Sequence, residues 1–241
     1  MKTIPHAGAA ALALMLCAGG SPVSARTGAV ASACGEGFDD VGALSGRGWI
    51  IQNVSDPLGT TSWFQGIAAI FPSQAGPSDS YASADFHNAS GSFPVISDWL
   101  VTPDLTFAPG NTFSFWTREL DSLGEAANRL EVLMCVDGEG QPCTDIGPAS
   151  GDTDGYVTDL VDVNPDEVAH GYPSVWTQYI VTSAMGLRES GSGRIAFHYY
   201  TFAQGDGTWG TTIGVDTLSI ATTAACALGS SDTIFADGFD G

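Results

Sequence analysis

The feature that most constrains the fold is a series of short segments in which apolar, mostly aromatic residues alternate with polar or small ones. They lie at 98–103, 112–118, 174–179, 193–200 and 213–220. Alternation over five to eight positions is typical of a strand with one buried face. Turn residues such as Pro57, Gly110 and Gly138 separate these segments. The sequence therefore predicts an all-β fold.

Weaker alternating segments complete the set. We expect strands near 36–41, 48–53, 61–66, 80–87, 98–105, 112–118, 129–136, 155–163, 174–183, 193–201 and 212–220. Short strands at this spacing, with turn residues between them, fit two packed antiparallel sheets. About 200 residues are within the range of one such β-sandwich.

The first 25 residues have the organisation of a secretory signal peptide. Lys2 supplies the positive charge, 7–18 form the apolar core, and Val23-Ser24-Ala25 is a small-x-small cleavage site. We expect a linker at 26–33, one domain at 34–221 and a tail at 222–241. The tail contains Phe235 and Phe239 among acidic residues, so it either packs back on the domain or acts as a sorting or attachment segment.

The formal net charge of the chain is −20. Such a chain is repelled by nucleic acid and by anionic membrane surfaces, which argues against both as partners. The excess of carboxylates either keeps an exported protein soluble or binds divalent cations. No segment after the expected signal peptide is long and apolar enough to be a transmembrane helix.

Cysteine usage indicates disulfides. Four cysteines follow the expected cleavage site, at positions 34, 135, 143 and 226, and an even number in an exported chain favours pairing. Four cysteines allow three connectivities. A local bridge between Cys135 and Cys143 across a Gly-rich turn is natural, and Cys34 would then pair with Cys226. Loop entropy gives these bridges about 2.6 and about 5 kcal/mol.

Several phrases, taken together and in order, resemble the choice-of-anchor J domain, an exported bacterial jelly roll related to cleaved-adhesin and MAM-like domains. They are EGFDDVGALSGRGW (36–49), FPSQAGPSDSYASADF (71–86), ISDWLVTPDL (96–105), NTFSFWTR (111–118), NRLEVLM (128–134), GYPSVWTQYIV (171–181), GRIAFHYY (193–200) and IGVDTLSI (213–220). The resemblance implies a jelly-roll β-sandwich and an exported binding or adhesion module, with no reaction attached.

The same relationship suggests a calcium ion. Related jelly rolls often hold structural Ca²⁺ where the first and last strands meet. Glu36, Asp39 and Asp40 lie in the entry segment and Asp216 in the final one, and Ca²⁺ takes six to eight oxygen ligands. The alternative is that Asp39, Asp40 and Asp216 are turn, edge or cap residues.

One acidic segment suggests an enzyme. Glu119, Asp121 and Glu125 are similar to the E-x-D-x-x-E signature of laminarinase-type jelly-roll glucanases, in which paired carboxylates act on a glycosidic bond. Three residues separate Asp121 from Glu125, one more than the signature has, so solvated loop acids are the preferred interpretation. His198 alternates with Phe197 and Tyr199, and we expect it to face solvent or a satisfied hydrogen bond.

Exposed aromatic rings are the candidate ligand site, because the C–H faces of sugars pack on them. Trp49, Trp63, Trp99, Trp116 and Trp176 lie in strand-like runs, where core packing is expected. Trp209 lies in a Gly-rich loop, and Tyr200 is close to it in sequence. We therefore expect a secreted or surface-associated, monomeric, non-catalytic module that binds a glycan or a surface protein. A glycoside hydrolase and a purely structural surface protein are the alternatives.

Overall fold

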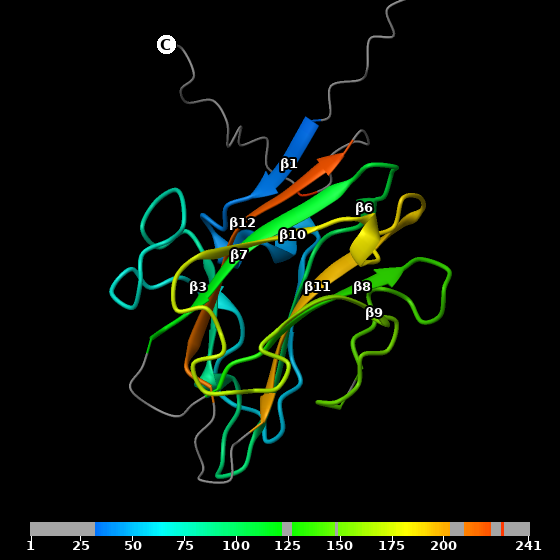
Figure 1. Cartoon of the computed structure of the whole chain (residues 1–241). Coiled ribbons are helices and arrows are strands. Elements are labelled where there is room, and N and C mark those ends of the chain that lie inside the picture. The colour runs from blue at the N-terminus through cyan, green and yellow to red at the C-terminus, as the bar shows by residue number, and fades with distance from the viewer. Residues whose placement is uncertain (1–31, 122–126, 148, 203–209, 223–227, 229–241) are drawn as a thin grey trace, which may run out of the picture.

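The alternating segments form two antiparallel β-sheets packed face to face, as the computed structural model shows (Figure 1). The structure describes residues 32–121, 127–147, 149–202, 210–222 and 228. Within these ranges the helical elements are short 3₁₀ turns, at Val41–Ala43, Ser45–Arg47, Phe86–Asn88 and Ser183–Met185. The expected all-β sandwich of two antiparallel sheets is confirmed.

Each sheet has six strands. Sheet A runs in the order β10-β7-β12-β4-β3, and β1 also pairs with β12. Its strands are β1 (Ser32–Glu36), β3 (Phe64–Gln65), β4 (Ala82–Asp85), β7 (Thr112–Glu119), β10 (Thr177–Val181) and β12 (Thr212–Thr222). Sheet B runs in the order β2-β5-β11-β8-β9, with β6 paired to β11. Its strands are β2 (Ile50–Asn53), β5 (Val95–Val101), β6 (Leu105–Thr106), β8 (Leu130–Val136), β9 (Thr158–Val163) and β11 (Ser192–Phe202).

The main core lies between the sheets. In β7 every second residue is buried, so Phe113 and Phe115 point inward while Trp116 lies on the outer face. Phe115 meets Phe197 of β11 edge-to-face, with ring centroids 5.2 Å apart. Each such fully buried ring contributes about 1.5–3 kcal/mol, and together they hold the two sheets in contact.

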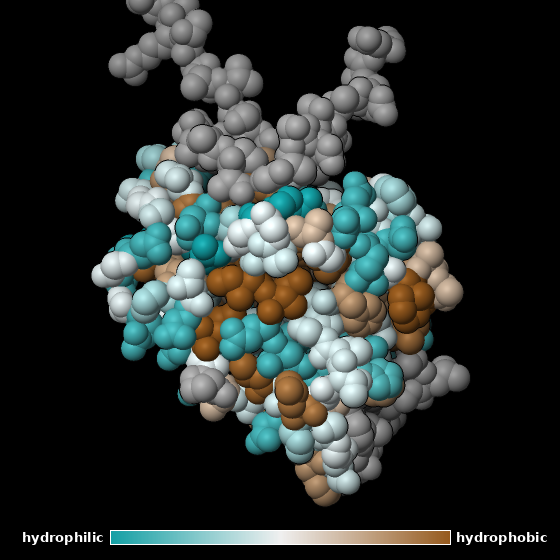
Figure 2. Space-filling model, turned by 180° about the vertical axis from the view of Figure 1, so that it is seen from behind, coloured by the Kyte–Doolittle hydropathy of each residue, from teal (hydrophilic) through white to brown (hydrophobic). Residues whose placement is uncertain are grey.

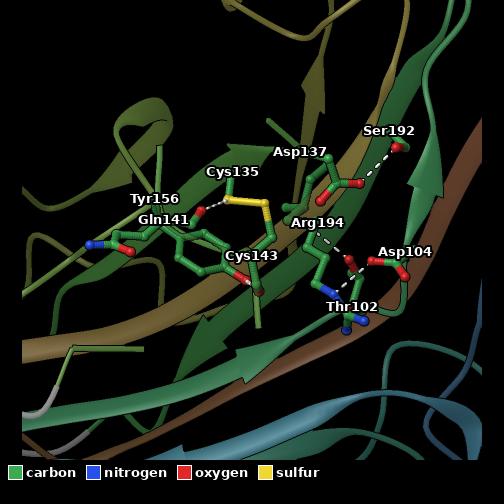
Figure 3. Close-up of a disulfide and its surroundings, with 10 residues drawn as sticks. Thr102, Asp104, Cys135, Asp137, Gln141, Cys143, Tyr156, Ser192 and Arg194 are labelled. Atoms are coloured by element: carbon green, nitrogen blue, oxygen red, sulfur yellow. Dashed lines mark hydrogen bonds and ion pairs between the residues drawn. A yellow bond between two sulfur atoms is a disulfide. The ribbon is translucent and has the colours of Figure 1, made fainter. Parts of the chain in front are cut away.

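A second apolar cluster covers part of the outer face of sheet B. The segment that follows β8 folds back over this face, and its Tyr156 packs against Trp99 with ring centroids 5.5 Å apart. A disulfide between Cys135 and Cys143 fixes the segment, with the two Cα atoms 5.5 Å apart (Figure 3). The Tyr156 hydroxyl donates to the carbonyl of Cys143 at 2.6 Å. The predicted local bridge is confirmed.

The first strand differs from expectation. We predicted a strand at 36–41, but β1 ends at Glu36 and a 3₁₀ turn begins at Val41. Side-chain carboxylates accept hydrogen bonds from backbone N–H groups in this segment. Glu36 accepts from the Phe38 N–H at 2.9 Å, and Asp40 accepts from the Ala43 N–H at 3.1 Å. Such local bonds compete with a strand ladder, and Phe38 takes a left-handed φ of 56°.

Both ends of the domain reach further than the boundaries we expected. β1 begins at Ser32, inside the segment predicted as a linker. Leu228 lies beyond position 221, yet it is fully buried in the main core. Cys34 is disulfide-bonded; its expected partner, Cys226, lies outside the described residues. No helix in the described part of the chain has the length and apolarity needed to cross a membrane.

Candidate functional site

A row of stacked rings runs along β11 on the outer face of sheet B. His198 stacks on Trp99 of β5 with ring centroids 3.8 Å apart and planes 18° apart. Tyr200 stacks on His198 at 4.9 Å, and Phe202 meets Tyr200 at 4.9 Å with its ring turned by 72°. Trp99 and His198 are buried, Tyr200 is partly exposed and Phe202 is 41% exposed. The row therefore leads from the buried cluster to solvent.

Polar contacts fix the ring of His198. Its Nδ1 lies 2.8 Å from Oε2 of Glu131, and its Nε2 lies 2.8 Å from Oγ of Ser97. Because a carboxylate only accepts, Nδ1 carries the proton and Nε2 accepts from the Ser97 hydroxyl. Burial lowers the pKa of His198, against the opposing effect of Glu131, so the ring is neutral. The expectation of a satisfied hydrogen bond is confirmed.

Serine, histidine and glutamate are thus in the order of a catalytic triad. A nucleophile must reach its substrate, however, and Ser97 is fully buried. Its Oγ also accepts the Trp99 indole N–H at 3.3 Å. The arrangement positions the ring row, and we assign it no hydrolytic role.

An arginine clamped by two carboxylates lies beside the open end of the row. Arg129 donates through Nε and Nη2 to Asp162 at 3.0 and 2.6 Å, and its Nη2 lies 2.7 Å from Oε1 of Glu131. Its guanidinium centre is 5.8 Å from the centroid of the Tyr200 ring. All three charged side chains keep some exposure. This end of sheet B therefore combines partly exposed rings with fixed hydrogen-bonding groups.

Exposed apolar side chains occur on several parts of the surface. The far side of the molecule carries an apolar patch near its middle, bordered by hydrophilic residues (Figure 2). Among the described residues, the exposed large apolar side chains are those of Leu58, Ile67, Phe86, Phe93, Val157, Val168, Val175, Ile180, Met185 and Phe202. Of the two residues predicted to contact a ligand, Tyr200 belongs to the ring row; Trp209 lies outside the described residues.

The four predicted metal ligands are not gathered at one point. Glu36 is buried and bound by Arg47, whose Nη2 lies 2.7 Å from Oε2 of Glu36; burial raises the pKa of Glu36. Asp40 caps the 3₁₀ turn at Val41 and is exposed. Asp40 therefore has the cap role that the alternative interpretation gave it.

Asp39 and Asp216 instead reach the same loop. Asp39 accepts from the Ser80 hydroxyl at 2.5 Å, and Asp216 accepts from the Gln74 N–H at 2.6 Å. A β-bulge in β12 aims Asp216 at this loop, and Thr217 takes a left-handed φ of 47° there. Burial raises the pKa of Asp216 to about 7, against its backbone hydrogen bonds. Among the described residues, no three or more His, Cys, Asp or Glu side chains are grouped so as to hold a metal ion.

The candidate glucanase acids do not share one exposed face. Glu119 is the last residue of β7 and is buried, with the Asn128 side-chain amide donating to it at 2.6 Å. Asp121 is exposed beyond the strand end, and Glu125 lies outside the described residues. The prediction of solvated loop acids is therefore wrong for Glu119, because the alternation that buries every second side chain of β7 extends to that residue.

Two tryptophans are not where sequence reasoning put them. Trp49, Trp63 and Trp99 are buried as expected, but Trp116 and Trp176 lie on the outer face of sheet A and are partly exposed. The sequence of β7 indicates the outward position of Trp116, because side chains alternate between the two faces of a strand and Phe113 and Phe115 take the buried face. Trp176 donates its indole N–H to the carbonyl of Pro72 at 2.9 Å.

Comparison with known proteins supports the architecture. No family model and no curated protein matches the sequence. Among solved structures, the K1 cleaved adhesin domain of Lys-gingipain from Porphyromonas gingivalis W83 superposes with a TM-score of 0.51. The chains share 15% identity, and the match covers 80% of this chain and 99% of that domain. The likeness is one of fold.

Two further structures match with lower scores. The K3 cleaved adhesin domain of the same protein has a TM-score of 0.46 at 17% identity, covering 78% of this chain and 98% of that one. A structure described as one of carbohydrate-binding modules from the β-sandwich superfamily has a TM-score of 0.36 at 11% identity, covering 72% and 56%. Neither score adds to the argument for the fold.

Proposed function

We propose that this chain is an exported, non-catalytic binding module whose ligand is an extracellular glycan. The observation that carries the proposal is the ring row on the outer face of sheet B, which ends in the partly exposed Tyr200 and Phe202 beside Arg129. Sugars pack their C–H faces on such rings and hydrogen-bond to fixed polar groups next to them.

The side chains of this surface are held in fixed positions in the absence of a ligand. Tyr200 is held by His198, and Arg129 is held by Asp162 and Glu131. A ligand therefore meets side chains that have little rotamer freedom left to lose, which lowers the cost of association. We include Trp209 in the proposed site as a further ring, because it follows Phe202 by seven positions in a Gly-rich segment.

The proposal includes surface attachment and the choice-of-anchor J family. The K1 domain of Lys-gingipain is a cleaved adhesin domain, and the sequence phrases given above resemble a related exported family. The predicted signal peptide at 1–25 provides the export route. Mass spectrometry of the secreted chain tests this part, because cleavage after Ala25 leaves Arg26 as the first residue.

The proposal also includes a structural Ca²⁺. Of the four carboxylates predicted as its ligands, two are kept. Asp39 and Asp216 fit best, because both reach the loop at 74–80, whose carbonyl and hydroxyl oxygens are further hard ligands. Glu36 fits poorly because Arg47 already neutralises it. Melting with calcium and with EDTA tests this: an unchanged melting temperature in wild type removes calcium from the proposal.

The deciding experiment is a glycan array on residues 26–241, with sugar release assayed on every glycan that binds. We expect binding without release. Tyr200→Ala and Phe202→Ala should each weaken binding at least tenfold, whereas Ile180→Ala, an exposed apolar change on sheet A, should not. No bound glycan, or equal binding by all three variants, would contradict the proposed site.

Release of sugar would instead favour the hydrolase alternative. Glu119→Gln should abolish the release in that case, since a carboxylate is needed as acid or nucleophile. If no glycan on the array binds, a protein ligand or a structural role is favoured. Gel filtration of the same preparation checks the expected monomer.

A further inference from the structure

The arginines of this acidic protein are unequally neutralised. Five arginines are described: Arg47, Arg118, Arg129, Arg188 and Arg194. Four of them form ion pairs with carboxylates. Among the described residues, no carboxylate forms an ion pair with Arg118, although Asp121 is near enough to act on it electrostatically. In a chain with a net charge of −20, such a cation on a sheet surface calls for an explanation.

Arg118 is nevertheless held in place. Its Nη2 donates to the Ser174 carbonyl at 2.5 Å, and its Nε donates to the Glu119 carbonyl at 3.3 Å. Its guanidinium centre lies 4.5 Å from the centroid of the Phe71 ring. Carbonyl dipoles and a ring face stabilise a cation without cancelling its charge. Only part of the guanidinium is used, and its remaining N–H groups can serve a ligand.

Gly214 makes room for the rings around this arginine. It lies opposite Arg118 in β12, and a Cβ there would lie 2.9–3.0 Å from atoms of Phe71, Trp176 and Tyr81. The three rings are therefore packed on the outer face of sheet A, over the backbone of β12. Phe71 and Tyr81 are buried in this packing, whereas Trp176 keeps part of its surface exposed.

A second partly exposed indole lies on the same face. Trp116 precedes Arg118 by two positions in β7, so both side chains point away from the core. Its cross-strand neighbours are Gln178 and Asp216. Arg118 and two partly exposed indole rings, those of Trp116 and Trp176, thus share the outer face of sheet A.

We propose that the outer face of sheet A binds an acidic saccharide, a sugar ring that carries a carboxylate, with Arg118 binding the carboxylate and Trp116 and Trp176 packing on the ring. The planar guanidinium matches a carboxylate with two parallel hydrogen bonds. The strongly negative chain repels a polyanion, so the ligand carries one carboxylate on an otherwise neutral unit. A nucleic acid would need several cations along its backbone. This site does not depend on the sheet B surface.

The test is an NMR chemical-shift titration of the full exported chain with two probes. One is the methyl glycoside of galacturonic acid, and the other is the methyl ester of that same glycoside. The two probes differ at one group, which is a charged carboxylate in the acid and a neutral methyl ester in the other. We expect the acid to bind at least tenfold more tightly than the ester, with shifts at the indole N–H of Trp116 and Trp176. Inorganic phosphate, a small anion without a sugar ring, should bind more weakly than the acid.

Three variants locate the site. Arg118→Gln should lose at least tenfold in affinity for the acid and bind acid and ester equally. Trp116→Ala should weaken both probes, because it removes ring packing and keeps the charge. Arg188→Gln is the matched control: it removes one positive charge from an exposed arginine that pairs with Glu139, and it should bind like wild type.

Each contrary result overturns the inference. These results are no binding of the acid by wild type, equal affinity for acid and ester, or unchanged affinity in Arg118→Gln. Melting of every variant identifies one that has not folded, and Arg118→Lys then replaces Arg118→Gln, with reduced but charge-dependent binding expected. Tyr200→Ala should leave this titration unchanged, so failure here and failure of the proposed glycan surface on sheet B are separate results.

Discussion

Nδ1 of His198 lies 2.8 Å from Oε2 of Glu131, although 67 residues separate them in the chain. The histidine is almost completely buried, while the glutamate side chain is 15% exposed. The contact therefore joins the buried part of the ring row to the charged group of Arg129 and Asp162 at the surface. His198 is also the stacking partner of Tyr200, with ring centroids 4.9 Å apart.

The first prediction concerns the acid side of the stability curve. Burial lowers the pKa of His198 below its usual 6.5, so the unfolded chain takes up this proton at a higher pH than the folded chain. The contribution of His198 is present above about pH 6.5 and is lost as the pH falls towards the folded pKa. NMR titration of the ring measures that pKa directly.

Glu131→Gln sharpens this test. The Glu131 carboxylate raises the pKa of His198 against the larger effect of burial, so its removal should lower that pKa further. Glu139→Gln, which removes a carboxylate paired with Arg188 instead, should leave the His198 titration unchanged. A pKa at or above 6.5 in wild type, or a rise in Glu131→Gln, would contradict the assignment.

Asp98 should act in the opposite direction. Its carboxyl group is fully buried on the core side of β5 and is met by the neutral side chains of Ser62 and Asn88 at 2.7 and 2.5 Å. Burial raises its pKa well above 3.8. As the pH rises above about 4, the unfolded chain loses this proton and the folded chain keeps it, so stability falls until the folded pKa is passed.

Asp98→Asn tests this because the amide has nearly the same shape and cannot ionise. The variant should show a flatter dependence of unfolding free energy on pH between about 4 and 7. Asp79→Asn, at an exposed carboxylate, is the control. If the wild-type and Asp98→Asn curves run parallel over this interval, Asp98 does not titrate as proposed.

The disulfide between Cys135 and Cys143 should stabilise the domain modestly. Its loop is short, with a sequence separation of 8, so replacing both cysteines with serine should lower the free energy of unfolding by about 2.6 kcal/mol. Denaturant titration measures the loss, and circular dichroism should show the fold retained. An unfolded double variant would mean that the buried cluster of Trp99 and Tyr156 depends on the bridge for its formation.

Leu228 should matter more than its position near the end of the chain suggests. The side chain is fully buried in the main core, so Leu228→Ala should cost about 2–5 kcal/mol. Leu58→Ala, at a residue 61% exposed, should change stability by less than about 0.5 kcal/mol. Equal effects of the two changes in urea unfolding would contradict the placement of Leu228 in the core.

Sequence reasoning succeeded where the physical signal is local. Phe113 and Phe115 alternate with polar residues in one strand, and that period of two decides which face they bury. Cys135 and Cys143 lie on either side of one turn, so few geometries compete with their pairing. The spacing of the short strands predicted two packed sheets, and the resemblance to exported jelly rolls implied the same architecture.

Sequence reasoning failed for contacts between residues that lie on strands far apart in the sequence. Ser97 reaches His198 across 101 residues, and nothing within either segment indicates this contact. The first strand was misplaced because side-chain caps from Glu36 and Asp40 outweigh the strand pattern after Glu36. Trp116 was assigned to the core by residue type, although the phase of its own strand puts it outside. The clusters on the outer faces of both sheets were therefore not foreseen.

The pairing of β1 with β12 has a mechanical consequence. Ser32 pairs with Thr222, and Glu36 pairs with Leu218, so the first residue of β1 and the last residue of β12 lie side by side (Figure 1). A force that separates Ser32 from Thr222 would load the hydrogen bonds of this antiparallel pair one after another, instead of shearing all of them at once. Cys34 lies two residues into the pair and is disulfide-bonded, so the third residue of the pair carries a covalent link in addition to the hydrogen bonds of the ladder.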